Sequence, residues 1–235
     1  MSFTIFSGKA AKGSRLQTGI LPIDRLCVGG SVDLSGLSAV TVLARDAGSF
    51  MTDPEMAVLD ITGYGRIEYD GGYVTHKFYL EGKNVEDDSN NRVLMVITQN
   101  GCLIEDGVKL YQLVLRQTPQ IWAPWLGWVD GVQPRIGSAL CYYEDICFQR
   151  VIEVADEPYL ETLQELVYED AFAPPVVVTH QCSEYARQLN DGTFEFLFAG
   201  TVEVHGSDGQ AIEEGCVEEY IGLVIDPNML VVYGF

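Results

Sequence analysis

Basic residues are scarce in this sequence. Fourteen lysines and arginines stand against 34 aspartates and glutamates, which gives a formal net charge of −20. The imbalance lies in the second half, since residues 151–235 carry 17 acidic groups and a single basic one, Arg187. Such a field repels phosphate backbones and anionic lipid head groups. We therefore expect no nucleic-acid partner, whereas a basic protein partner, or solubility alone, fits the charge.

Long apolar runs are also absent. No stretch reaches the 18 or more consecutive apolar residues of a spanning helix, and the N-terminus lacks the apolar core of a signal peptide. These absences predict a cytoplasmic protein without direct membrane insertion. None of the six cysteines forms a C-x-x-C pair, so we expect most of them to be reduced and buried. They are Cys27, Cys102, Cys141, Cys147, Cys182 and Cys216.

Catalytic and cofactor motifs are missing as well. The chain contains no G-x-x-x-x-G-K-[ST] phosphate loop and no G-x-S-x-G nucleophile elbow. Gly63-Tyr64-Gly65 begins like a dinucleotide fingerprint, but the sixth position is Glu68. The acidic stretch 84–90 lacks the central glycine and closing glutamate of a calcium-binding loop. We therefore predict no cofactor, no metal site and no catalytic residue.

The clearest positive signal is the stretch 193–225. Apolar residues alternate with polar ones at Phe194, Phe196, Phe198, Val202 and Val204, which is typical of a strand with one buried face. Ser207-Asp208-Gly209 supplies a turn, after which apolar residues return from Cys216. The pattern predicts a long antiparallel hairpin with a phenylalanine-rich inner face and an acidic outer face.

Turn signals separate other short β-rich runs. Asp70-Gly71-Gly72 predicts a hairpin joining 57–66 to 73–80, and Asn100-Gly101 predicts a turn after 92–98. Further strands are expected at 39–45 and 176–189, and at 102–105 and 110–116, which Asp106-Gly107 separates. Another is expected at 139–154, with a bulge or a tight bend near Glu144-Asp145. The predicted fold class is mainly β, with α+β as the alternative. Antiparallel meandering sheets would form a sandwich or a partly open barrel.

One or two short helices complete this prediction. Pro119–Trp128 is too rich in proline and tryptophan for an interior strand, and Pro158–Val167 carries leucines at near-helical spacing. Residues 1–15 are expected to form an N-terminal arm. Residues 16–235 would form one β-rich domain, or two subdomains that meet near 130–155.

Two features suggest a surface for a protein partner. The three tryptophans, Trp122, Trp125 and Trp128, fall within seven residues and would share one helical face, and tryptophan is enriched at interaction hot spots. The same face would equally serve to cap the core. On the predicted acidic face of the hairpin, Glu213, Glu214, Glu218 and Glu219 are the candidate contacts for a basic or membrane-associated protein.

The rival hypothesis is an enzyme or small-ligand-binding domain whose site is assembled from distant strands. Its candidate polar contributors are Tyr79, His76, Arg150, His180 and Glu195. A third alternative is a structural zinc site, in which His180 and Cys182 would combine with Cys141 or Cys147. Sequence spacing alone does not bring these residues together, and it sets no oligomeric state.

Three segments carry a family resemblance. They are GILPIDRLCVGGSVDL at 19–34, GYGRIEYDGGYVTHKFYLEG at 63–82, and YARQLNDGTFEFLFAGTVEV at 185–204, which runs on to VEEYIGL at 217–223. With these segments the chain resembles the bacterial YjfK-like family, a domain of unknown function. The resemblance implies no catalytic residue. It implies an accessory protein that binds other proteins in a membrane-associated or envelope-stress system.

Overall fold

The computed structural model describes residues 26–52, 58–82, 92–100, 103–127, 132, 134–154, 158–170, 172–205, 210–211 and 215–233. The predicted arm at 1–15 and the acidic stretch at 84–90 lie outside these ranges. The helices are α1 (Ser38–Asp46) and α2 (Ala123–Leu126), with 3-10 turns at Ser35–Leu37 and Pro227–Met229. The strands, in chain order, are β1 (Ser31–Asp33), β2 (Val58–Glu68), β3 (Tyr73–Glu81), β4 (Arg92–Asn100), β5 (Leu103–Gln117), β6 (Leu140–Tyr143), β7 (Ile146–Arg150), β8 (Glu161–Tyr168), β9 (Val176–Gln188), β10 (Phe194–His205), β11 (Cys216–Ile225) and β12 (Val231–Tyr233).

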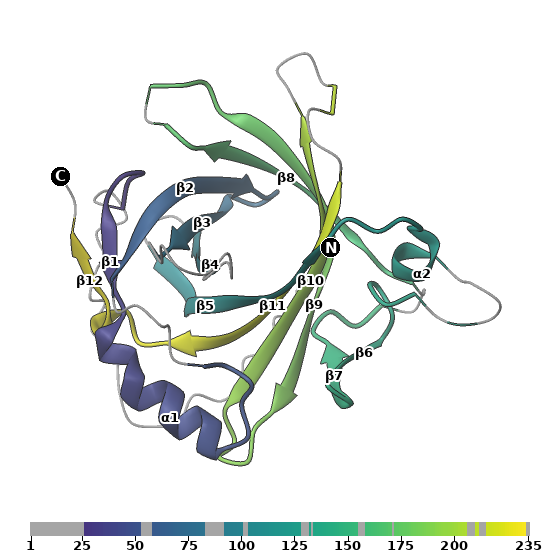
Figure 1. Ribbon diagram of the computed structural model, residues 1–235, viewed down its shortest axis with the longest axis horizontal. Helices are drawn as coiled ribbons and strands as arrows, with labels where there is room; N and C mark the ends of the chain where they lie inside the picture. The colour runs from purple at the N-terminus through teal and green to yellow at the C-terminus, as the bar shows by residue number, and fades with distance from the viewer. Residues whose placement is uncertain are drawn as a thin grey trace.

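These strands form one antiparallel sheet that closes into a barrel. Its order around the ring is β2, β3, β4, β5, β11, β10, β9 and β8, and β8 closes the ring by pairing with both β9 and β2. Figure 1 shows this ring, with α1 outside it. Strands β1 and β12 extend from β2, and β7 and β6 extend from β9. The mainly β, antiparallel prediction is confirmed, and the barrel is closed rather than partly open.

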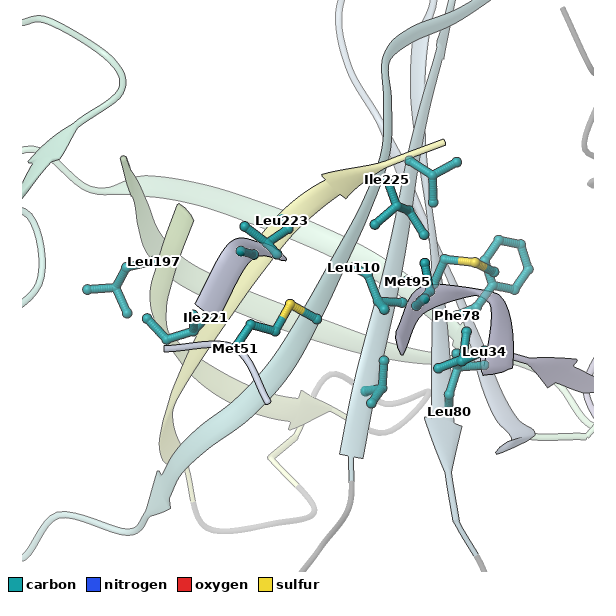
Figure 2. Packing of buried hydrophobic residues seen from close by; sticks show 14 of the residues in the cluster. Leu34, Met51, Phe78, Leu80, Met95, Leu110, Leu197, Ile221, Leu223 and Ile225 are labelled. Atoms are coloured by element: carbon teal, nitrogen blue, oxygen red, sulfur yellow. The ribbon is translucent and has the colours of Figure 1, made fainter. Parts of the chain in front are cut away.

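The main apolar core lies outside the ring. Leu34 and Leu37 before α1, Ala44 within it and Met51 after it pack in one buried cluster with side chains of the barrel strands. The labelled strand residues of that cluster in Figure 2 are Phe78, Leu80, Met95, Leu110, Leu197, Ile221, Leu223 and Ile225. Because successive strand residues point to opposite faces, the residues between these positions face the barrel interior.

Contacts across the ring identify the interior face. Lys77 on β3 contacts Glu165 on β8, although β2 separates these strands in the sheet. Lys109 on β5 contacts Glu184 on β9, although β11 and β10 lie between them. Strands three spacings apart in the sheet lie about 14 Å from each other, so Lys109 and Glu184 meet because both side chains project into the lumen of the curved barrel. The interior therefore holds buried charged groups among apolar side chains, and along each strand it alternates with the outer face that carries the main apolar core.

Several local predictions are confirmed. The hairpins β2–β3 and β10–β11 lie where the turn signals predicted them, and Gly71 and Gly72 adopt positive φ. The expected bend at Glu144-Asp145 is a tight turn between β6 and β7, with φ of 45° and 64°. The short helix expected within 119–128 is α2. Asp106-Gly107 does not separate two strands. It forms a bulge within the continuous strand β5, where the pairing with β4 shifts register.

Two element predictions are wrong. The strand predicted at 39–45 is helix α1, in which Thr41 and Ala44 are buried at a spacing of three residues. The helix predicted at 158–167 is instead strand β8. Its leucine spacing imitates a helix, but Glu165 and Val167 are buried on alternate positions because β8 closes the barrel. Tertiary pairing overrides local propensity at both places.

The acidic outer face predicted for the hairpin holds only at the far end of β10, where Glu203 is exposed, and is wrong at Glu195, which is fully buried. Phe196 and Phe198 face the interior, where they are partly buried against a smaller cluster of Leu94, Tyr111 and Tyr220. The intervening Glu195 and Leu197 are fully buried on the other side, under the residues that follow α1. Both faces of the middle of β10, from Glu195 to Thr201, are thus covered, which a period-two pattern with one apolar face does not predict.

Candidate functional site

A buried carboxylate organises one end of the barrel interior. Glu165 on β8 has no exposed surface, and its Oε2 lies 2.9 Å from the Lys77 Nζ and 2.7 Å from the His180 Nε2. The Tyr79 hydroxyl donates to Oε1 at 2.7 Å. Gly65 on β2 leaves room for this carboxylate, since a Cβ there would lie 1.6 Å from Oε1. Four strands therefore converge on one charge.

The charges and the burial of this cluster determine which of its side chains carry a proton. Burial by itself raises the pKa of Glu165, but the Lys77 ammonium and the His180 and Tyr79 donors outweigh it and lower that pKa to about 2. Burial, and then Lys77, lower the pKa of His180, so the imidazole is neutral at pH 7. An ionised carboxylate only accepts hydrogen bonds, so Nε2 carries the proton and Nδ1 is an acceptor. That Nδ1 is buried without a partner in the described part of the chain.

The same arrangement recurs twice along the interior. Glu184 accepts from the Lys109 Nζ at 2.6 Å and also from the Tyr111 hydroxyl. Glu218 accepts from the Tyr220 hydroxyl at 2.7 Å and lies 3.4 Å from the Arg116 Nε. Burial first, and the neighbouring glutamate second, raise the pKa of Tyr79, Tyr111 and Tyr220 well above the usual 10. Each of these glutamates thus combines one tyrosine donor with one basic group.

A cavity of about 160 Å³ lies beside these clusters. Its polar lining is supplied by Lys77, Lys109, Glu161, Glu184, Thr75, Thr98, Tyr69, Tyr111 and Cys182, and its apolar lining by Ile67, Leu94, Val96, Leu163 and Phe198. Burial, and then Glu184, raise the pKa of Glu161, and burial raises the pKa of the Cys182 thiol to about 12. The cavity is therefore preorganised for polar contacts, and its cysteine is a protonated thiol at neutral pH.

Only part of the rival site predicted from sequence is assembled here. Tyr79 and His180 meet at Glu165, as the hypothesis of a site from distant strands requires. His76 lies on the outer face, where it bonds Tyr64 and Gln99. Arg150 and Glu195 are also on that face and hold backbone groups, namely the Gly137 carbonyl and the Phe50 amide. These three do not contribute to the interior.

Sequence reasoning missed Glu165 and Lys77, although a signal existed. Lys77-Phe78-Tyr79 on β3 and Lys109-Leu110-Tyr111 on β5 repeat one pattern, a basic residue and a tyrosine on one face of a strand. Their glutamate partners come from β8 and β9, so no spacing along the chain reveals them.

A comparison of the sequence with known protein families gave a match. A family described as "Protein of unknown function (DUF2491)" matches residues 14–230. The chain belongs to this family. The DUF2491 region includes every residue of the interior clusters and of the cavity. No curated protein and no solved structure matches the chain.

The DUF2491 region also contains a larger hollow on the outside of the barrel, with a volume of about 520 Å³. Its wall includes Tyr64, His76, Gln99 and Tyr168. The Tyr64 hydroxyl and the Gln99 side chain already bond the two nitrogens of His76, at 2.8 and 3.1 Å. The interior, where charged groups from many strands converge, is therefore the better candidate site despite its smaller volume.

The predicted partner-binding residues do not form one surface in the part of the chain that the structure describes. Glu218 is inside the barrel, whereas Glu219 is buried on the outer face, where Arg135 binds it at 2.5 and 2.8 Å. Trp122 and Trp125 are partly buried against the outer core, and the Arg135 guanidinium lies 5.6 Å from the Trp125 ring. Trp128, Glu213 and Glu214 lie outside the described residues.

The alternative zinc set is not assembled. Cys182 and His180 face the interior, whereas Cys141 packs in the outer core and Cys147 is exposed. Across the described ranges, no group of three or more His, Cys, Asp or Glu side chains is placed to hold a metal ion. Among the helices in those ranges, none has the length and apolar character needed to cross a membrane.

Proposed function

We propose that this protein binds a small ligand inside the barrel. The observation that carries the proposal is the interior cavity, to which β2, β3, β4, β5, β8, β9 and β10 all contribute side chains. Barrels of eight strands are wide enough to hold one small ligand, as well as their own side chains. Convergent polar groups in a concave, partly apolar site are typical of ligand binding.

The energetics of the interior support the same proposal. Burying an ion pair such as Lys77 and Glu165 removes two charges from water, and an apolar pair of similar volume is often equally stable or more so. A fold that needed only stability would therefore gain little from these clusters. Fixed charges and donors that line a cavity do provide orientation and specificity for a bound molecule.

A substitution that fills the cavity is expected to abolish ligand binding. Val96 on β4 lines the cavity, and Val96→Phe would place a ring in it. A library of small polar molecules is screened against the wild type by amide NMR. We expect shifts at cavity residues, and a loss of at least about tenfold in affinity in the variant, because a filled site excludes its ligand.

Val231→Phe on β12 is the matched control, because it makes the same change at an exposed position outside the ring. If Val96→Phe does not fold, Leu163→Phe fills the cavity from β8 instead. The proposal is wrong if no molecule shifts cavity residues, or if both filled variants bind as the wild type does.

We infer a second candidate function, protein binding, from exposed apolar side chains near α2 and on the β6–β7 hairpin. Ile121 is 68% exposed, Tyr142 52% and Leu140 44%. Exposed apolar side chains of this size are frequent at interaction sites, and the net charge of −20 favours a basic partner. The resemblance to YjfK-like proteins implies the same function. It implies an accessory protein in a membrane-associated or envelope-stress system.

The partner hypothesis predicts salt-sensitive capture from the native cell. Ile121→Asp combined with Glu213→Lys and Glu214→Lys is expected to reduce capture of a basic protein at least about fivefold, because both the apolar and the charged contacts are lost. Val42→Asp, at an exposed valine of α1, is the control. Equal capture by the triple variant and the control would exclude Ile121, Glu213 and Glu214 as contacts of the captured protein.

A further inference from the structure

The charges of the interior do not balance. The basic groups of the clusters and cavity are Lys77, Lys109 and Arg116, and the acidic groups are Glu161, Glu165, Glu184 and Glu218. Three positive and four negative charges leave one negative charge, since His180 is neutral. Glu165, Glu184 and Glu218 each have a basic partner. The unbalanced carboxylate is Glu161.

Glu161 is placed to receive a ligand. It is the first residue of β8, it is half-buried, and it lines the cavity. Its carboxylate makes no hydrogen bond or ion pair with any other residue that the structure describes. Glu184 lines the same cavity, and its contacts with Lys109 and Tyr111 both use Oε1, which leaves Oε2 for a further contact. Two carboxylates of the cavity can therefore accept hydrogen bonds from a bound cation.

The rest of the lining suits an ammonium group. The Lys109 Nζ lies 4.4 Å from the centre of the Phe196 ring, and the Lys77 Nζ lies 5.5 Å from that of Phe198. Each of these ammonium groups thus has both a carboxylate and an aromatic face. A third ammonium, brought by a ligand, would find the same combination in Glu161 and the rings of Tyr69 and Phe198, which also line the cavity.

We infer that the barrel interior selects a small primary ammonium compound, whose charge binds Glu161 and whose short apolar part packs against Leu94, Val96 and Leu163. This inference rests on the proposed ligand-binding function and specifies its ligand class. The volume of about 160 Å³ limits the ligand to a few non-hydrogen atoms. The remaining charge of the interior disfavours an anion of the same size, because it would face an unpaired carboxylate.

Three probes of equal length and different charge test the inference on the full chain at pH 7. They are n-butylammonium, 1-butanol and butyrate, and binding is measured by amide NMR titration. We expect n-butylammonium to bind at least about tenfold more tightly than 1-butanol, and butyrate to bind most weakly, because the lumen has one negative charge in excess. Glu161→Gln should reduce n-butylammonium affinity about tenfold and leave 1-butanol affinity unchanged.

Glu169→Gln is the matched control, since it removes one negative charge from an exposed position just beyond the same strand. It should keep the preference for the ammonium probe. If the probes shift cavity residues without a charge preference, or if Glu161→Gln keeps that preference, the ammonium inference is overturned while ligand binding stands. If none of the three probes shifts cavity residues, the ammonium inference fails, and the library screen with Val96→Phe decides separately whether the lumen binds any ligand.

Discussion

Replacing Glu165 by Ala is expected to lower the free energy of unfolding by about 3–5 kcal/mol, because it leaves the Lys77 ammonium buried without its counter-charge. Lys77 has only 6% of its side chain exposed, so water cannot replace the lost carboxylate. The Tyr79 hydroxyl and the His180 Nε2–H also lose their acceptor. Urea unfolding followed by circular dichroism measures this change.

Two further variants separate the charge effect from lost volume. The double variant Lys77→Met, Glu165→Leu removes both charges, so it should be clearly more stable than Glu165→Ala alone. Glu169→Ala, at an exposed position just beyond the same strand, should change the stability by less than about 0.5 kcal/mol. A double variant as unstable as Glu165→Ala would show that packing, rather than the unpaired ammonium, causes the loss.

The free energy of unfolding should also depend on the ionisation of Glu165 at acid pH. The pKa of Glu165 is about 2 in the folded chain, against an ordinary value of 4.5. Because the folded-state pKa is depressed, the stabilisation is fully present above about pH 4.5 and is lost as the pH falls towards 2. Glu165→Ala should therefore remove this part of the acid dependence between pH 4.5 and 2.

The hairpins were predictable because their determinants are local. Asp70-Gly71-Gly72 favours the positive φ of its own turn, whereas the turn at Glu144-Asp145 is signalled only by the break in the alternation of the residues that flank it. The identity of β8 was not predictable in this way. The spacing of its leucines is typical of a helix. The segment forms a strand because it pairs with β2 and β9 where the barrel closes.

The faces of the strands were harder to predict than the strands themselves. A period-two pattern says that Phe196 and Phe198 share a face, and they do, but it does not say that the opposite face is also covered. Because α1 and the residues after it pack on the outside, Glu195 is buried with Arg187 and the Phe50 amide as partners. The acidic composition of this half thus overstates its exposed charge.

The candidate site was predictable only in part, for the same physical reason. Tyr79 and His180 stood out as polar residues within apolar strands, and both contact Glu165. Glu165 itself lay in the segment predicted as a helix, where a glutamate would face solvent. The contact between β3 and β8 depends on the register of the whole ring, which no local pattern encodes.

Gly65→Ala should be nearly as damaging as the loss of Glu165 and is expected to cost about 3 kcal/mol, since it forces the same buried carboxylate away from its partners. A Cβ on Gly65 would lie 1.6 Å from the Glu165 Oε1 and 2.6 Å from its carboxyl carbon. Gly63→Ala on the same strand is the matched control, because the nearest atom there is 3.2 Å away, on the Tyr79 ring. It should cost less than about 1 kcal/mol.

A double-mutant cycle tests the cause of the Gly65→Ala effect. In the Glu165→Ala background the carboxylate is gone, so adding Gly65→Ala should cost at most about 1 kcal/mol, which corresponds to a coupling energy of about 2 kcal/mol. Equal costs of about 3 kcal/mol in both backgrounds would place the clash outside Glu165, whereas a small cost of Gly65→Ala in the wild type would mean that Glu165 moves aside freely. A carboxylate that moved so freely could not hold Lys77, Tyr79 and His180 in fixed positions, and the interior would then lack the rigidity that selective ligand binding requires.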